Sequence, residues 1–223
     1  MIDYARLRQN MVETQVMPND VNDRRILRAM RDVPRERFVP GPKAMVAYMD
    51  SEIEVIPSVR GANGRGLMSP MLVGKLLQAA SLEPGERVLE IGCATGYLSA
   101  VAAHIAGEVV GLEDNPELVK VARAVTAELG LANVQIVEGP LAAGFAAGEP
   151  FDVILLNGQI PEIPKELFQQ LTPGGRILAI VGSSQLARAM IGTYIGGSST
   201  IRGLFDASAR PLPGFERRLE FQF

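Results

Sequence analysis

Apolar residues follow two different spacings, and the change comes near residue 70. Before that point apolar side chains recur at helical intervals, at Leu7 and Met11 and again from Ile26 to Met30, and prolines interrupt the pattern. After it, short β-branched runs alternate with segments of helical spacing, which is typical of a parallel sheet covered by helices. The pattern predicts an N-terminal helical cap over residues 3 to about 57, followed by an α/β domain.

The α/β part contains candidate strands that are short and rich in valine, isoleucine and leucine. These strands are Arg87–Ile91, Val109–Glu113, Val134–Glu138, Phe151–Leu155 and Arg176–Val181. Candidate helices precede and separate them: Pro70–Ala80, Tyr97–Ala106, Pro116–Leu129 and Pro164–Leu171. This order predicts a Rossmann-like, doubly wound, mainly parallel sheet with helices on both faces. Beyond Gly192 we expect Thr200–Phe205 and Arg217–Phe223 to add an antiparallel edge.

Local signals also predict how individual helices begin and end. Asn22 or Asp23 is expected to cap the second helix of the N-terminal region, and Pro34 is expected to end it. Ser69 can cap the helix that starts at Pro70, because proline suits the first helical position. We divide the chain into residues 1–69 and 70–223 and expect the two parts to form one structural unit.

Composition and charge exclude several classes of protein. The 223 residues are 47% hydrophobic and 21% charged, as in a globular protein with one large domain. With a net charge of -3 and no dense Lys/Arg run, we expect no nucleic-acid partner. The N-terminus lacks a signal-peptide layout and no apolar run reaches roughly 18 residues, so we expect a cytoplasmic protein without membrane partners. Cys93 and His104, each the single residue of its type, make a Cys/His metal site improbable.

The clearest chemical signal is an apolar strand, Val88–Ile91, that runs into a loop of small residues and opens a helix at Tyr97. Small side chains let the backbone approach a ligand, and the helix start presents unpaired N–H groups. Glycines stand at 92 and 96 rather than at 92, 94 and 97, so the spacing disfavours a nicotinamide dehydrogenase. Glu113 ends the next strand, where an acidic side chain can accept hydrogen bonds from both ribose hydroxyls of a nucleoside.

Two motifs carry a resemblance to known families. The run Glu90-Ile91-Gly92-Cys93-Ala94-Thr95-Gly96 resembles the first motif of class I methyltransferases, E/D-x-G-x-G-x-G, with Ala94 replacing the middle glycine. Asp23–Met30 and Val33–Val39 resemble the signature V-L-x-A-M-x-x-V-P-R-x-x-F-V of protein-L-isoaspartate O-methyltransferases, and the resemblance runs from about residue 6 to 182. Leu82–Gly92, Pro150–Ile154 and Pro173–Arg176 are also similar to that family.

The resemblance implies that residues 70–223 bind S-adenosylmethionine as the cofactor. It also implies that residues 1–69 form a helical cap and the loop that holds the acceptor. It implies methylation of the free carboxylate of isoaspartyl residues, so the substrate is a damaged protein or peptide. A small molecule that carries a carboxylate is the alternative substrate. The cofactor residues that it implies are Glu90, Gly92, Ala94, Gly96, Glu113, Gly139 and Pro140. Glu90 would lie near the cofactor's amino-acid portion, and Gly139 and Pro140 near its adenine.

The chain departs from the family at the acceptor loop, where G-Q-T-I-S-Q-P becomes Gly64-Arg65-Gly66-Leu67-Met68-Ser69-Pro70. Met68 stands at the family's serine, so we expect Ser69 to act as the catalytic hydroxyl, with Gly64, Arg65 and Met68 binding the substrate. The family's adenine-side G-D-G becomes Glu138-Gly139-Pro140, which lacks the aspartate. The C-terminal V-x-F-V-P-L strand of the family is not recognisable.

A carboxylate acceptor is already ionised at neutral pH, so methyl transfer to it needs positioning, desolvation and an anion clamp rather than a general base. Arg60, Arg65 and the start of the helix at Pro70 are candidates for that clamp. Three alternatives stay open. Ser69 is only a helix cap, the enzyme methylates another acceptor, or the chain is a non-catalytic homologue that binds the cofactor. None of these sequence patterns distinguishes a monomer from an oligomer.

Overall fold

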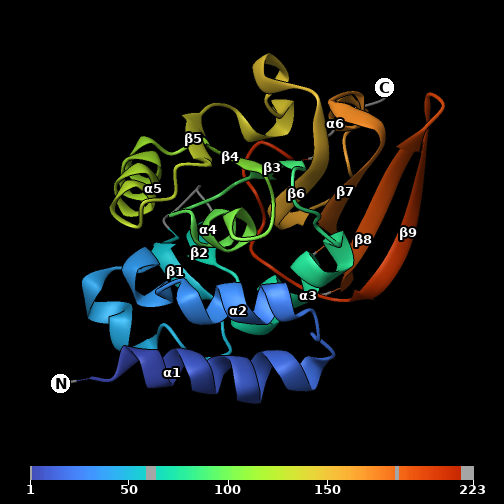
Figure 1. Cartoon of the computed structure of the whole chain (residues 1–223). Coiled ribbons are helices and arrows are strands. Elements are labelled where there is room, and N and C mark those ends of the chain that lie inside the picture. Colours follow the sequence, from blue (N-terminus) through green and yellow to red (C-terminus); the bar gives the residue numbers. More distant parts are fainter. Residues whose placement is uncertain (1, 59–63, 184–185, 217–223) are drawn as a thin grey trace.

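The computed structural model of the protein describes residues 2–58, 64–183 and 186–216, and these residues form a seven-stranded sheet flanked by helices (Figure 1). The strands lie in the order β5-β4-β3-β6-β7-β8-β9. Their bounds are β3 (Arg87–Ile91), β4 (Glu108–Glu113), β5 (Val134–Glu138), β6 (Phe151–Ile160), β7 (Leu171–Ser183), β8 (Leu186–Ile195) and β9 (Ser198–Asp206). The helices around the sheet are α3 (Pro70–Ala80), α4 (Tyr97–Ala103), α5 (Pro116–Glu128) and α6 (Lys165–Gln169).

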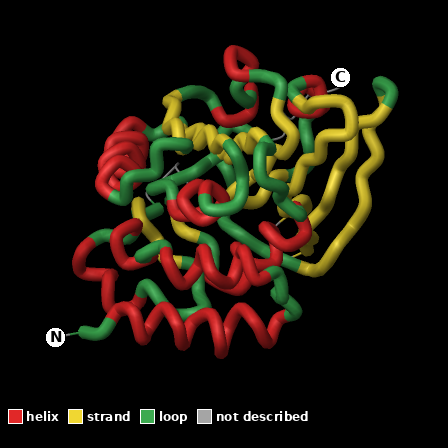
Figure 2. The backbone as a smooth tube through the Cα atoms, in the orientation of Figure 1, coloured by secondary structure: helices red, strands yellow, loops and turns green. Residues whose placement is uncertain are grey.

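The sheet is parallel from β5 to β7 and antiparallel beyond it, which confirms the doubly wound fold predicted from the sequence. The chain runs from β3 through β4 to β5 on one side, and then returns to place β6 on the other side of β3 (Figure 2). This reversal creates a topological switch point between β3 and β6. In open parallel sheets, ligands bind outside the carboxyl ends of the strands at such a point.

The five strands and four helices predicted for residues 70–181 are all present, and most boundaries agree within a few residues. The edge contains one more strand than predicted, because residues 186–195, to which we assigned no element, form β8. Gly192 lies inside β8, and a side-chain carbon there would come within 2.7 Å of the Phe168 ring, so packing explains this glycine. Thr200–Phe205 lies within β9 as predicted. Arg217–Phe223 falls outside the described residues.

The N-terminal region contains α1 (Tyr4–Met11) and α2 (Arg24–Asp32), which lie against the α3 and α4 side of the sheet (Figure 1). Asp23 caps α2 by accepting from Arg25 N at 2.8 Å, and the helix ends before Pro34, as predicted. The helical cap is present, but its last predicted residues form a strand instead of a helix or loop. Ile53–Ile56 forms strand β1, which pairs antiparallel with β2 (Arg65–Leu67), because this β-branched run finds a partner inside the loop that precedes α3.

Successive residues of the central strands face opposite layers of the core. Val88 and Val153 pack with α3 and α4, whereas Leu89 and Ile154 pack with Leu167 and other residues around α6. This arrangement follows from the alternation of side chains along a strand, and burial on both faces explains why the strands read as nearly continuous apolar runs. In the described part of the chain, no helix is both long enough and apolar enough to cross a bilayer.

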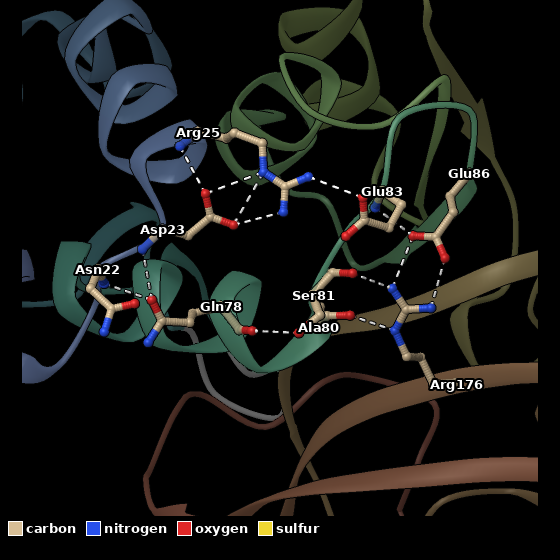
Figure 3. Close-up of polar contacts among 9 residues, drawn as sticks. All are labelled: Asn22, Asp23, Arg25, Gln78, Ala80, Ser81, Glu83, Glu86 and Arg176. Carbon is tan, nitrogen blue, oxygen red and sulfur yellow. Dashed lines mark hydrogen bonds and ion pairs between the residues drawn. The ribbon is translucent and has the colours of Figure 1, made fainter.

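Polar contacts connect the cap, α3 and the sheet (Figure 3). Arg176 of β7 donates to the carbonyls of Ala80 and Ser81 at the end of α3 and forms an ion pair with Glu86 at 2.8 Å. At the same helix, Gln78 Oε1 accepts from the backbone N–H of Asn22 and of Asp23, just before α2. These contacts hold α3 between the cap and the sheet, and thereby fix the position of the residues at its start.

Glu90 is the carboxyl group buried within the central strand, and its side chain has no exposed surface. It accepts hydrogen bonds from Ser99 Oγ of α4 and from Asn157 Nδ2 of β6, the latter at 2.6 Å. Burial raises the pKa of Glu90 from an ordinary value of 4.5 to about 7, and the two hydrogen bonds oppose part of that increase. Glu90 therefore titrates near neutral pH in the folded protein.

We expect this shift to make folding stability fall as the pH rises from about 4.5 to about 7. In this window the unfolded chain releases the Glu90 proton while the folded chain retains it, so unfolding becomes progressively more favourable, and the loss is complete above the folded pKa. Glu90→Gln does not titrate, and it keeps both contacts when its oxygen accepts from Asn157 Nδ2 and its amide nitrogen donates to Ser99 Oγ. Between pH 5 and 8 the wild type should lose roughly 2–3 kcal/mol more unfolding free energy than this variant, measured by urea denaturation.

The control for this measurement is Glu166→Gln, which removes an exposed carboxylate on α6. It should follow the wild-type dependence on pH. Parallel curves for wild type and Glu90→Gln would contradict the assignment of a raised pKa to Glu90.

Candidate active site

The loop between β3 and α4 adopts a backbone that favours glycine at three positions. Gly92 has φ +80°, Ala94 φ +52° and Gly96 φ +91°. The N–H groups of Gly92 and Cys93 both donate to Leu112 O, at 2.8 and 3.0 Å, and so attach the loop to β4. Ala94 is thus an alanine in the left-handed region, where glycine is favoured, and such strain costs about 1–2 kcal/mol. This is the position at which the methyltransferase motif has its middle glycine.

The carboxylate of Glu113 is the centre of the hydrogen-bonding network at this loop, and it is fully buried. Its Oε2 accepts from Ala94 N at 2.7 Å and from Arg65 Nη2 at 2.7 Å. Its Oε1 accepts from the N–H groups of Asp114 and Asn115, at 3.2 and 3.3 Å. An acidic side chain at the end of β4 therefore faces the loop after β3, which is the arrangement that the sequence predicted.

The adenine-side candidates lie beside the same strand end. Glu138 is in register with Glu113 across β4 and β5, and Gly139 N donates to Glu113 O at 3.0 Å. Gly139 is half-buried and Pro140 is exposed. The structure brings Gly92, Ala94 and Glu113 together with these residues at the carboxyl edge of the sheet, next to the switch point.

The signature Val33–Val39 packs directly against this loop. Phe38 lies edge-on to Tyr97, with ring centroids 5.5 Å apart, and its carbonyl accepts from Thr95 Oγ1 at 2.6 Å. Arg35 is fully buried, lies 4.6 Å from the centre of the Tyr97 ring, and donates to the carbonyl of Met68 at 2.7 Å. The signature therefore joins the loop after β3 to the segment before α3.

The surroundings of Arg65 differ from those that we predicted. We expected it in the acceptor site, but its guanidinium forms a buried ion pair with Glu113. A side-chain carbon at Gly92 would lie 3.1 Å from Arg65 Nη2 and 2.6 Å from Leu212 Cδ2, so both side chains lie against the loop. Arg65 Nε is buried without a hydrogen-bond partner. Arg60, the other predicted clamp residue, falls outside the described residues.

The other acceptor candidates lie at the start of α3 and immediately before β2. Ser69 Oγ accepts from Leu72 N at 3.4 Å and caps α3, while Asp50 Oδ1 accepts from Met71 N at 3.2 Å. Asp50 and Ser69 line a cavity of about 770 Å³, together with Met68, Lys75 and residues 205–211. Gly64 belongs to the hairpin, where a side-chain carbon would come within 2.6 Å of Ile56 O.

Three contributors to the site were missed by sequence reasoning. Asn157, in β6, holds Glu90 through Nδ2 and leaves Oδ1 buried without a partner. Leu212 lies against both Gly92 and Gly158, because the segment after β9 turns back over β6. Thr95 connects the loop to the cap. None of them belongs to a sequence pattern that predicts these long-range contacts.

Comparisons with known proteins agree on one family. The sequence model of the protein-L-isoaspartate(D-aspartate) O-methyltransferase family matches residues 6–194. A protein-L-isoaspartate O-methyltransferase from Koribacter versatilis is 34% identical over 211 residues, which are 95% of this chain and 92% of the relative. One from Rhodopseudomonas palustris is 38% identical over 188 residues, 84% of this chain and 74% of the relative.

Solved structures give the same result. A protein-L-isoaspartate O-methyltransferase superposes with a TM-score of 0.81 at 25% identity, over 93% of this chain and 66% of that chain. A Plasmodium falciparum beta-aspartate methyltransferase in complex with S-adenosyl-L-homocysteine superposes with a TM-score of 0.75 at 18% identity, over 91% and 96% of the two chains, which shows the shared fold. The chain belongs to the protein-L-isoaspartate(D-aspartate) O-methyltransferase family.

Proposed function

We propose that this protein transfers the methyl group of S-adenosylmethionine to the free carboxylate of isoaspartyl residues in damaged proteins. As a member of this family the chain is an S-adenosylmethionine-dependent methyltransferase. The observation that carries the proposal is the buried Glu113 carboxylate facing the Gly92–Gly96 loop at the switch point of the sheet. A cytoplasmic location, and a protein rather than a small molecule as the acceptor, are further parts of the proposal.

Glu113 and the loop fit a nucleoside. In the proposal the ribose donates a hydrogen bond to the Glu113 carboxylate, and adenine lies along Gly139 and Pro140, where the backbone and apolar atoms make the contacts. Gly92, Ala94 and Gly96 let the loop approach the cofactor. Asn157 Oδ1 is a buried acceptor without a protein partner, so it can take a hydrogen bond from the cofactor's ammonium group.

Glu90 is separated from the ligand in this proposal. Its carboxyl group is enclosed by Ser99 and Asn157, so it acts on the cofactor's amino-acid portion through Asn157 rather than by direct contact. S-adenosylmethionine, when bound, supplies a methyl group on a positively charged sulfur. The protein orients the acceptor carboxylate in line with that methyl group and removes water from it, which is worth about 7–11 kcal/mol for positioning alone.

For the acceptor we propose the region of Gly64, Met68 and Ser69. The Ser69 hydroxyl accepts from Leu72 N and still has its own O–H to donate to a carboxylate. Two observations favour a second candidate, a homologue with a different acceptor. Asp50 already occupies Met71 N at the start of α3, and Met68 supplies apolar bulk where the family has a hydroxyl.

The proposal predicts that the protein incorporates labelled methyl groups into an isoaspartyl peptide but not into its aspartyl twin. The product should be a methyl ester that alkali hydrolyses to methanol, because the nucleophile is a carboxylate. Glu113→Ala should lose this activity through weak cofactor binding. Methylation of both peptides or of neither would refute the isoaspartyl acceptor, and in the second case retained binding of S-adenosylhomocysteine would identify a non-catalytic homologue.

The adenine contact predicts a gain of affinity on restoring the missing acid. Gly139 lies outside the left-handed region, and an added side-chain carbon meets only Leu112 Cδ1, at 3.2 Å, so an aspartate can be accommodated. Gly139→Asp should bind S-adenosylhomocysteine about tenfold more tightly by calorimetry, the value of one charge-assisted hydrogen bond of roughly 1.5 kcal/mol. Gly139→Ala is the matched control and should not gain affinity. Equal affinities for both variants would place adenine elsewhere.

A catalytic role of Ser69 is tested by comparison with Asp23, which also caps a helix. Ser69→Ala should lower turnover per folded molecule more than tenfold with little change in cofactor affinity, and should also cost about 0.5–2 kcal/mol of stability. Asp23→Ala removes the cap of α2 and should cost similar stability while turnover is unchanged. If both variants lose stability but keep the wild-type turnover per folded molecule, Ser69 is a helix cap and has no catalytic role.

A further inference from the structure

The Glu113 carboxylate is saturated by the protein itself. An ionised carboxylate offers about four acceptor positions. In the described residues Glu113 accepts from four donors, namely the N–H groups of Ala94, Asp114 and Asn115 and the guanidinium of Arg65. Three of these donors belong to backbone that the loop and the strand end hold in place, whereas Arg65 is a side chain from β2. Ribose hydroxyls can reach Glu113 only if a donor leaves, and Arg65 is the donor that can move.

Packing around Gly92 supports the same conclusion. The guanidinium of Arg65 and the side chain of Leu212 both lie where a substituent on Gly92 would be, on the surface of the loop that the cofactor needs. Arg65 is 6% exposed, and its Nε has no partner, so Glu113 satisfies only part of its hydrogen-bonding capacity. The contact is electrostatically favourable but incomplete, and a second anion would satisfy the guanidinium better.

We propose that Arg65 is a displaceable arginine that couples the two substrates. Before the cofactor binds, Arg65 neutralises Glu113 and occupies the ribose position. A ribose hydroxyl then takes the acceptor position on Oε2 that Arg65 leaves, and the released guanidinium binds the carboxylate of the acceptor. This inference rests on the proposed function, because it requires a ribose at Glu113 and a carboxylate acceptor.

Thermodynamic linkage makes the coupling measurable in either direction, because a cofactor that frees Arg65 must raise acceptor affinity by the same factor as the acceptor raises cofactor affinity. In the wild type, saturating S-adenosylhomocysteine should tighten the binding of an isoaspartyl peptide at least tenfold, measured by calorimetry. In Arg65→Ala this coupling should disappear. The same variant should bind S-adenosylhomocysteine alone about fivefold or more tightly than the wild type, because the competitor for Glu113 is gone.

Two further variants keep the test decisive. Arg65→Gln retains an amide donor beside the buried Glu113 and should fold even if Arg65→Ala does not. It should show a smaller gain in cofactor affinity, because a neutral amide competes less strongly than a guanidinium, and the same loss of coupling. Arg37→Ala removes an arginine that pairs with Glu128 on the surface, and it should match the wild type in every measurement.

The outcomes separate this inference from the proposed function. Absence of S-adenosylhomocysteine binding by the wild type would refute the function itself. Wild-type binding with unchanged or weaker cofactor affinity in both Arg65 variants would overturn the displacement of Arg65. Coupling that persists in both variants would overturn the transfer of Arg65 to the acceptor.

Discussion

The hydrogen bonds of the buried Glu113 carboxylate are the interaction on which the carboxyl edge of the sheet depends. This carboxylate lies at the end of β4 and joins the loop after β3, the turn after β4 and the hairpin strand β2 through its four hydrogen bonds. A buried charge of this kind is stable only if it is paired and hydrogen-bonded, so its donors must stay in place around it. The carboxylate thereby holds the left-handed backbone at Ala94 in a conformation that an alanine rarely adopts.

The cap contacts both the start of α4 and the loop after β3, where Thr95 donates to the carbonyl of Phe38. Arg35 connects Tyr97, at the start of α4, with the carbonyl of Met68, and Phe38 packs against the same tyrosine. A displacement of the cap would therefore move the loop after β3 and the start of α3 together. This coupling explains in physical terms why a signature located far from the loop in the chain accompanies it.

Arg65 and Ser69 are four residues apart, yet they face different surroundings. Arg65, in β2, contacts Glu113 and the loop, whereas Ser69 caps α3 beside Asp50 at the cavity of about 770 Å³. Arg65 is the first residue of β2, whereas Ser69 lies two residues beyond the end of that strand and begins α3, so the chain has changed from strand to helix between them. The proposed acceptor region would therefore be bordered on one side by a cation and on the other by a hydroxyl.

The sequence by itself determined the α/β fold, the central strands, the loop at Gly92–Gly96 and the acid at Glu113, because these depend on local periodicity and on spacing within one β-loop-α-β unit. It also determined the caps at Asp23 and Ser69, which are local hydrogen bonds. Tertiary structure alone decided the contacts of Arg65 with Glu113, of Leu212 with Gly92 and of Glu90 with Asn157. Each of these joins residues more than 45 positions apart, and no local pattern specifies which buried group a distant side chain will meet. The strands β1 and β8 belong to the same class, because a short or glycine-containing run becomes a strand only when a partner strand supplies its hydrogen bonds.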